Sequence, residues 1–506
     1  MIECPIPHFH HMKTTMSSIL AAVLLLFSVS VLAQTSVTVS TLAGQPLSSG
    51  SSDGTGSAAR FCYLTAITAD NAGNLYVADT NNHTIRKIVA STGAVTTLAG
   101  LAGSSGSVDG TGSAARFNNP SGVAVDGAGN VYVADTLNHT LRKVSSLGAV
   151  STLAGSTGSS GSVDGVGSAA RFNRLQGLAI DAGSNLYVAD TNNHTIRKVV
   201  LSTGAVATVA GLAGNSGSTD GSGSVARFTF PSGVAIDSAG TLYVADTENH
   251  TIRTIPPSGL VSTLAGLAGS SGSADGTGSA ARFDSPTDVA VDLSGNVYVA
   301  DTDNFTIRKV VPSTGAVSTV AGLAGASGST DGSGSAVRFF GPTGIAVDTS
   351  SSFYVADTNN HTVRVGLLPT MPVILKQPAN GSVHVDNGFR FSVSASGRPA
   401  VTYQWYFNGT AISGATSSVF TDVATSSSAG VYTVVVSNAM GSVTSKGATL
   451  SIDTTSQQSF WGGLNGGGAG GGAPSEWFYG ILLLVAAGRL FQRRRKVGMP
   501  AANSLI

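Results

Sequence analysis

A segment that reads LYVADTNNHTIRKI at residues 75–88 returns five more times along the chain with few changes. The aspartate of its VADT sequence falls at Asp79, Asp135, Asp190, Asp246, Asp301 and Asp357, so consecutive copies are alternately 56 and 55 residues apart. Such a repeat constrains the fold more than any single motif, because each copy must form the same small unit and bury its apolar surface against its neighbours.

Each copy predicts four short strands. LYVA at 75–78 and TIRKI at 84–88 are rich in strand-forming residues, and the TNNH between them favours a turn. An apolar run ending in Asp precedes this pair, as in GVAVD at 122–126, and a fourth run follows it, as in GAVTTLAG at 93–100. Four strands in this order, here called a, b, c and d, are the content of one blade of a β-propeller.

The two ends of the array complement each other. The sixth copy stops after strand c at Val365, whereas an isolated strand d, VTVSTLAG at 37–44, precedes the first copy. Together they complete six blades. We therefore expect an all-β fold in which an N-terminal strand closes a six-bladed β-propeller and removes the open sheet edges that invite aggregation.

The sequence pattern GVAVD…NVYVADT.NHTIRKV resembles the NHL repeat, and its copies cover roughly residues 37–366. The resemblance implies an NHL-type propeller over residues 34–366. One feature departs from it. The insertion between strands d and a, for example GLAGSSGSVDGTGSAARF at 100–117, is longer than that repeat usually carries.

Because antiparallel strands alternate in direction, the b–c turns and the d–a insertions should emerge on one face of the propeller. Loops on a rigid scaffold often carry binding, so this face is the candidate recognition surface. A structural interpretation stays open, because Asp-Gly caps turns, Asp/Arg pairs tie loops to blades, and a site would break the sixfold symmetry. The candidate binding residues are Asp109, Asp164, Asp220, Asp275 and Asp331 of the insertions, with His83, His139, His194, His250, Phe305 and His361 of the turns.

A ligand that binds to some blades in preference to others should contact the positions where the copies differ in sequence. On the candidate face these are Phe305, Leu137, Glu248, Asp303, Arg174 and Phe340.

The pattern predicts no catalytic residues, no metal site and no cofactor. Histidines on separate blades are too far apart to hold zinc at ~2.0–2.1 Å unless they line the axis. The insertions lack the D-x-D-x-D run of a calcium loop. An enzyme of the lyase or lactonase type is the alternative, and it would need unique acidic, His or Asn residues at the axis. With 27 Lys and Arg against 27 Asp and Glu, no net field favours nucleic acid.

Both flanks of the array indicate export. Lys13 before the apolar run 19–31, with Ala33 at a small-residue cleavage site, predicts a signal peptide over 1–33.

A linker over 367–372 leads into short alternating strands at 373–453. Trp405 and AGVYTVVVSN around Tyr432 resemble an immunoglobulin I-set domain, which implies a β-sandwich; Val393 and Val434 stand where its cysteines would fall.

The C-terminal tail reads as a Gly-rich linker over 454–476, a short transmembrane or sorting helix over 477–491 and a basic cytoplasmic tail over 492–506. It resembles bacterial sorting signals that a membrane protease removes, and a plain membrane anchor is the alternative. The basic cluster at 493–496 then lies in the cytoplasm and both folded domains lie outside it.

We expect a surface-held binding or adhesion protein with an unidentified protein or carbohydrate partner. A structural envelope protein is the third reading.

Overall fold

The computed structural model describes residues 37–350 and 352–453. The expected signal peptide, Gly-rich linker, transmembrane or sorting helix and basic tail lie outside the described residues. Within the described ranges, no helix is long and apolar enough to cross a membrane.

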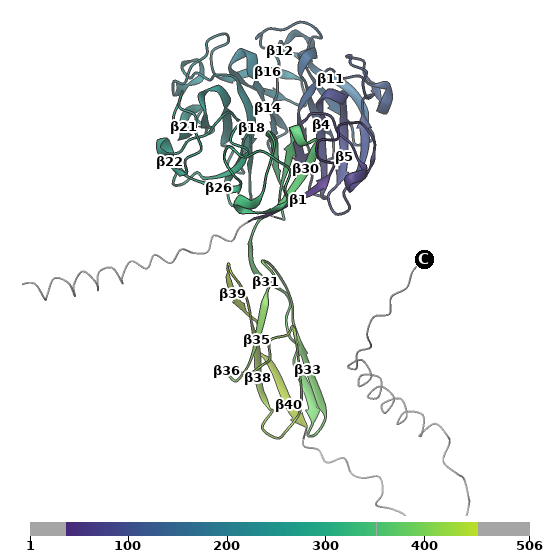
Figure 1. Ribbon diagram of the computed structural model, residues 1–506, viewed down its shortest axis with the longest axis vertical. Helices are drawn as coiled ribbons and strands as arrows, with labels where there is room; N and C mark the ends of the chain where they lie inside the picture. Colours follow the sequence, from purple (N-terminus) through teal and green to yellow (C-terminus); the bar gives the residue numbers. More distant parts are fainter. Residues whose placement is uncertain (1–36, 351, 454–506) are drawn as a thin grey trace, which may run out of the picture.

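Six five-stranded antiparallel sheets form a closed ring (Figure 1), which confirms the six-bladed all-β propeller. In each sheet the strands a, b, c and d pair in sequence order, and the a strands of adjacent blades contact one another around the axis. The a strands are β3 (Leu64–Ala69), β8 (Pro120–Val125), β13 (Leu178–Ile180), β18 (Pro231–Ile236), β23 (Pro286–Val291) and β28 (Pro342–Val347). The b strands are β4 (Asn74–Asp79), β9 (Val131–Asp135), β14 (Asn185–Asp190), β19 (Leu242–Asp246), β24 (Val297–Asp301) and β29 (Ser352–Asp357).

The outer half of each blade is built from strands c and d. The c strands are β5 (Thr84–Val89), β10 (Thr140–Val144), β15 (Thr195–Val200), β20 (Thr251–Ile255), β25 (Thr306–Val311) and β30 (Thr362–Leu367). The d strands are β6 (Ala94–Ala99), β11 (Ala149–Gly155), β16 (Ala205–Ala210), β21 (Leu260–Gly266), β26 (Ala316–Gly322) and, for the last blade, β1 (Thr38–Ala43).

A fifth strand of two residues, which the sequence did not predict, lies outside strand d in every blade. The insertion supplies it, because the chain runs to the outer edge of the next blade before it returns to the axis as strand a. The extra strand pairs with part of strand d and so covers an edge that could pair with another chain. These strands are β2 (Gly54–Thr55), β7 (Gly110–Thr111), β12 (Gly165–Val166), β17 (Gly221–Ser222), β22 (Gly276–Thr277) and β27 (Gly332–Ser333).

The N-terminal strand closes the ring, as predicted. β1 pairs with β30 on one side and with β27 on the other. Its Thr41 also donates its backbone N–H and its hydroxyl to the carboxylate of Asp331, at 3.1 and 3.0 Å. The first strand of the chain is therefore held by the last blade.

Apolar side chains fill the spaces between blades. In one such cluster, Tyr76 and Ala78 of the first blade pack with Phe117, Val131 and Val133 of the second, all of them buried. Because each core cluster joins neighbouring blades, no blade can bury its own apolar surface alone.

The C-terminal domain is a β-sandwich around Trp405, whose side chain is completely buried. Val393 and Val434 lie in the same core, where the resemblance placed them. The Tyr432 hydroxyl donates to the carbonyl of Ser428 at 3.1 Å, which is the tyrosine corner of immunoglobulin-like domains. The strands are β31 (Thr370–Lys376), β32 (Gly381–His384), β33 (Gly388–Ser392), β34 (Ser394–Arg398), β35 (Thr402–Phe407), β36 (Thr410–Ala411), β37 (Val419–Val423), β38 (Gly430–Asn438), β39 (Gly441–Thr444) and β40 (Ala448–Asp453).

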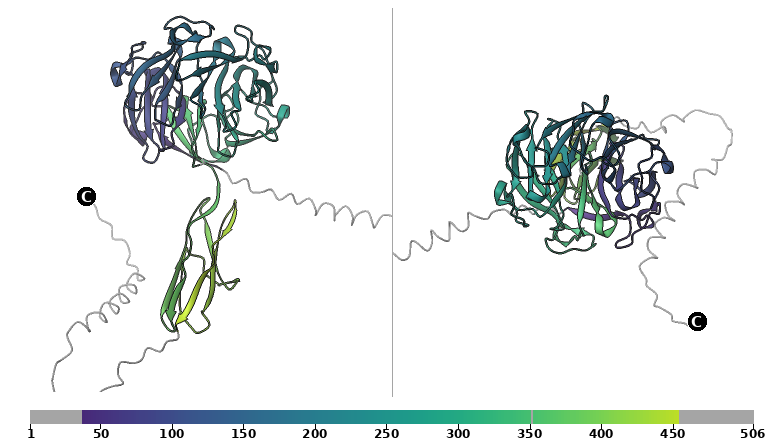
Figure 2. Two further views of the ribbon diagram at one scale, coloured as in Figure 1. Left: turned by 180° about the vertical axis from the view of Figure 1, so that it is seen from behind. Right: turned by 90° about the horizontal axis from the view of Figure 1, so that it is seen from above.

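The linker between the two domains is shorter than expected. Strand β31 already begins at Thr370, inside the expected 367–372 linker, because Thr370 pairs with Arg398. The sandwich is joined to the ring by one connection next to β30 (Figures 1 and 2). There, Arg398 donates to the carbonyl of Ser350 and to the hydroxyl of Ser352, at the a–b turn of the last blade. These contacts are therefore at the opposite end of the strands from the b–c turns.

Candidate functional site

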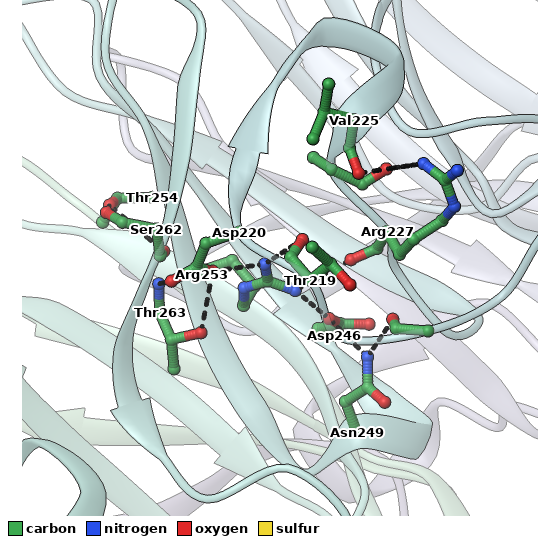
Figure 3. Close-up of polar contacts among 12 residues, drawn as sticks. Thr219, Asp220, Val225, Arg227, Asp246, Asn249, Arg253, Thr254, Ser262 and Thr263 are labelled. Carbon is green, nitrogen blue, oxygen red and sulfur yellow. Dashed lines mark hydrogen bonds and ion pairs between the residues drawn. The ribbon is translucent and has the colours of Figure 1, made fainter.

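A buried arginine organises each blade, as Figure 3 shows for the fourth. The Arg253 guanidinium lies 2.7 Å from Asp246 at the end of strand b and 2.6 Å from Asp220 in the insertion. It also donates to the carbonyls of Arg227 and Thr219 and stands over the ring of Phe228. We call this unit, an arginine of strand c between two aspartates, the arginine clasp. The equivalent arginines are Arg86, Arg142, Arg197, Arg308 and Arg364.

The insertion aspartates singled out in the sequence are the outer members of these clasps. Asp220 accepts hydrogen bonds from the backbone N–H and the hydroxyl of Thr263 in strand d, and half of its side chain is exposed. The same contacts recur in the other blades. Each aspartate thus fastens an insertion to strands c and d, which favours the structural interpretation of this residue set.

The inner aspartate of the clasp is fully buried. Burial raises the pKa of Asp246 to about 6, although the positive charge of Arg253 and hydrogen bonds from Asn249 and the Thr229 N–H oppose the shift. All its contacts are with protein groups of its own blade and insertion. It is a packing and positioning group.

The turn histidines join neighbouring blades. His83 ends its turn in the left-handed backbone conformation, with φ of 58°, and its Nδ1 accepts the backbone N–H of Asn119 in the next blade at 3.1 Å. His139, His194, His250 and His361 repeat this contact with Arg174, Phe230, Ser285 and Tyr63. Burial lowers the pKa of His83, which favours the neutral ring that can accept this hydrogen bond.

Phe305 takes the place of the sixth histidine and packs edge-on against Phe340 of the last blade, with ring centroids 6.2 Å apart. The structure does not bring the insertion aspartates and the b–c turn residues together in one site. The aspartates bind the outer strands c and d, and the turn residues contact the chain just before strand a. In the described ranges, no three His, Cys, Asp or Glu residues form a group suited to a metal ion.

The large cavity of the propeller is its axial channel, with a volume of about 1270 Å³. Strand a of every blade lines it. The channel runs from the b–c turns, represented by Leu137, to the a–b turns, represented by Asp181, Asp237 and Leu293.

A ring of hydroxyl groups fixes the wall of this channel. The Thr287 hydroxyl, for example, donates to the carbonyl of Thr343 in the next blade at 2.8 Å and contacts the hydroxyl of Thr302 in its own turn. Gln176 replaces the hydroxyl in the third blade. The ring is completed by Thr65, Ser121, Ser232 and Thr343.

The residue after this ring is small in five blades because adjacent backbones nearly touch there. A Cβ on Gly122 would lie only 1.8 Å from the carbonyl oxygen of Gln176. In the fifth blade the residue is Asp288, which bridges to the last blade by accepting the backbone N–H of Ile345 at 3.0 Å. Burial raises the pKa of Asp288 to about 7. Asp288 is the one acidic side chain at this position of the ring, and sequence analysis missed it although it replaces Gly or Ala in the aligned copies.

The blades differ from one another at the b–c end of the channel. The residue held by each turn histidine has a left-handed backbone, with φ from 49 to 57°, and each blade supplies a different side chain. In the last blade the equivalent residue is Gly341, with φ of 65°. The six residues, called the variable ring, are Tyr63, Asn119, Arg174, Phe230, Ser285 and Gly341. The repeated histidine contact thus holds the same backbone in five blades while the side chain changes.

The match to known repeats agrees with this architecture. The NHL repeat matches six times, at residues 61–88, 117–144, 172–199, 228–255, 283–310 and 339–365. The chain contains six NHL repeats. Each match includes the insertion phenylalanine, strand b, the turn and strand c, so the NHL repeats carry the clasp arginine, its inner aspartate and the turn residue that is His in five copies. The insertion aspartates of the clasps lie outside the matched residues. The immunoglobulin I-set domain matches residues 372–452.

The curated relatives match this chain over part of their length. NHL repeat-containing protein 2 of Bos taurus is 32% identical over 342 residues, which are 61% of this chain and 47% of that protein. Protein SUPPRESSOR OF QUENCHING 1, chloroplastic, of Arabidopsis thaliana is 30% identical over 283 residues, 52% of this chain and 26% of that protein. The alignments thus span less than half the length of these relatives.

Solved structures support the fold. A protein of unknown function from Bacteroides thetaiotaomicron superimposes with a TM-score of 0.52 at 22% identity, over 65% of this chain and 76% of that one. A structure described as an auxiliary nutrient binding protein from Bacteroides ovatus gives a TM-score of 0.50 at 17% identity, with the same coverage. At these identities the likeness shows the fold alone.

Proposed function

We propose that this chain is an exported, surface-held binding protein whose ligand docks at the b–c end of the axial channel. The observation that carries the proposal is the variable ring. Five of its positions share one left-handed backbone conformation and one histidine contact, yet all six side chains differ. Structural devices repeat around a propeller, whereas a recognition site needs chemistry that differs from blade to blade.

The repeated residues of the propeller make structural contacts, whereas the variable residues are left free to bind. The arginine clasps and the turn histidines use their polar groups on protein partners, so the repeated charges on this face are largely engaged. The variable side chains have more freedom: Tyr63 and Phe230 are 44% and 41% exposed. Rigid loops that present exposed, diverse side chains suit binding with little entropy loss.

The place of the second domain also supports the proposal. The sandwich contacts the ring through Arg398 at an a–b turn, away from the b–c end of the channel. If the tail beyond the sandwich holds the chain at a membrane or cell wall, the sandwich acts as a spacer. Cell fractionation with and without residues 477–506 tests this part: the shortened chain should move from the envelope to the medium.

The binding test is an array of glycans and proteins probed with purified protein. Tyr63→Ala and Phe230→Ala should each weaken whichever signal is found. Leu147→Ala is the matched control, because Leu147 is 87% exposed on a c–d turn at the other end of the strands. Equal loss with the control, or no loss with either ring variant, would place binding elsewhere.

A second candidate function, chemistry inside the channel, is favoured by Asp288. A carboxyl whose pKa is raised to about 7 can take or give a proton near neutral pH, and this one lines the channel. The reaction type proposed is that of a lyase or lactonase. Asp288→Asn should then abolish turnover of a bound lactone or ester while its affinity is kept, and unchanged turnover would remove this candidate.

A further inference from the structure

We infer that the b–c end of the channel binds a saccharide carrying a single carboxylate, a uronic acid residue, on blades one to three. The inference rests on the proposed function and names its ligand class. The binding groups are Tyr63, Asn119, Arg174 and Gln176, called the mouth site; all four line the channel.

Arg174 supplies the charge. Its side chain is exposed, and no carboxylate or carbonyl partner binds its guanidinium within residues 37–350 and 352–453. The six insertion arginines differ in this respect, since each donates to nearby backbone carbonyls, as Arg116 does to Ser113 and Ala115. The backbone N–H of Arg174 donates to Nδ1 of His139 at 3.2 Å, and this contact fixes the position of the backbone that carries the side chain.

The neighbouring groups suit a polyhydroxylated ring. Tyr63 offers an exposed aromatic face with a hydroxyl at its end, and such faces pack against the C–H surface of a sugar. The Asn119 amide donates to Asn81 at 3.2 Å and keeps its oxygen available as an acceptor. Gln176 stands where the other blades have a hydroxyl engaged with the protein, and it brings an amide to the channel wall. Amides and a phenol can both donate to and accept from sugar hydroxyls.

The charge balance of the channel limits the ligand to few carboxylates. Arg174 is the sole cation among the described residues that line it, whereas Asp181, Asp237 and Asp288 supply three carboxyl groups. A densely charged polyanion or an acidic peptide would pair one carboxylate with Arg174, and its other carboxylates would find no second cation in the lining and would face Asp288. Asp181 and Asp237 lie at the far, a–b end of the channel. A carbohydrate with one acidic residue at its end pairs the guanidinium without that repulsion.

Calorimetric titration of the purified chain with trigalacturonate in which two of the three residues are methyl-esterified, so that one terminal residue keeps its carboxylate, tests the inference. The fully esterified trimer and a peptide of three aspartates are the comparisons. The singly charged trimer should bind at least about tenfold more tightly than either comparison, which corresponds to about 1.4 kcal/mol. Arg174→Gln should remove this preference and leave the residual binding of the neutral trimer, whereas Arg390→Gln, the same charge change on the exposed face of the sandwich, should not.

Each remaining outcome contradicts the inference in a distinct way. If the neutral trimer binds as well as the charged one and Tyr63→Ala abolishes both, the recognition site stands and the acidic ligand is wrong. A preference for the peptide would replace the saccharide by an acidic protein segment. If none of the three probes binds, the ligand class is wrong, and the array with the variable-ring variants decides separately whether the site exists.

Discussion

The Nη1 atom of Arg253 lies 2.7 Å from Oδ2 of Asp246, and neither side chain is exposed to solvent. The same pair recurs in every blade, and each arginine reaches a second, half-exposed aspartate in the insertion. A buried ion pair contributes little net stability but makes its partners dependent on each other. The pair therefore fixes where the insertion lies, and so the backbone from which the variable ring projects.

Removing the arginine of one clasp should destabilise the propeller strongly. We expect Arg253→Met to cost about 3–5 kcal/mol, because Asp246 and Asp220 lose the cation that compensates their buried and half-buried charge. The double variant Arg253→Met, Asp246→Asn should recover part of this loss. Denaturant unfolding, followed by far-ultraviolet circular dichroism, measures the free energy of unfolding of the single and the double variant. A single variant as stable as the wild type would show that the clasp does not position the insertion.

The architecture could be predicted well from the sequence because the same four-strand pattern occurs six times. Strands a to d, the ring and its closure by 37–44 all follow from the period and the complementary ends, and the structure confirms them. The fifth strand escaped prediction because it is only two residues long and begins with Gly110, a residue type that is depleted in strands. Its two residues pair only because the insertion is pulled onto strand d by Asp109, which binds Thr152.

Deleting residues 37–44 should open the last blade. β30 would lose its outer partner strand, and Asp331 would lose the two hydrogen bonds from Thr41. The exposed edge should then promote aggregation and lower the melting temperature. Light scattering during a thermal ramp is the measurement. An eight-residue deletion at 462–469 serves as control, and a monomeric 37–44 deletion with wild-type melting would contradict closure by this strand.

Trp405 should carry the stability of the sandwich, because no disulfide supports its core. The side chain is fully buried among Phe391 and Phe420, and its indole N–H donates to the carbonyl of Ser417 at 2.9 Å. Trp405→Ala should cost the sandwich about 3–5 kcal/mol. Calorimetry of the full chain should show one transition lowered and the propeller transition unchanged. If Trp405→Phe and Trp405→Ala both melt like the wild type, the core depends on other residues.

The charge state of Asp288 should make stability depend on pH. Its pKa in the folded chain is about 7, above the ~3.9 of an unfolded chain, because the ionised form is poorly solvated in the channel. The folded chain therefore holds a proton that the unfolded chain has released, and the contribution present below pH ~4 is lost as pH rises toward 7. The melting temperature of the wild type should fall relative to Asp288→Asn between pH 4 and 7. Parallel curves for the two proteins would mean that Asp288 does not titrate in this range.

The candidate site was only partly predictable from sequence. Arg174 and Leu137 stood out as departures from the repeat, and both line the channel. Asp109 and the other insertion aspartates were chosen for their charge, but their partner, an arginine within strand c, can be recognised only once the strands are folded together. Tyr63 and Gln176 were missed because nothing in the order of the chain says which loop residue faces the axis.

The most direct test of the central claim is an electron density map of the propeller crystallised with the ligand that the array identifies. We predict density at the b–c end of the channel, in contact with the variable ring and including Tyr63 and Arg174. Ordered ligand at the a–b turns, on the outer strands or on the sandwich, with the channel mouth occupied only by water, would contradict it.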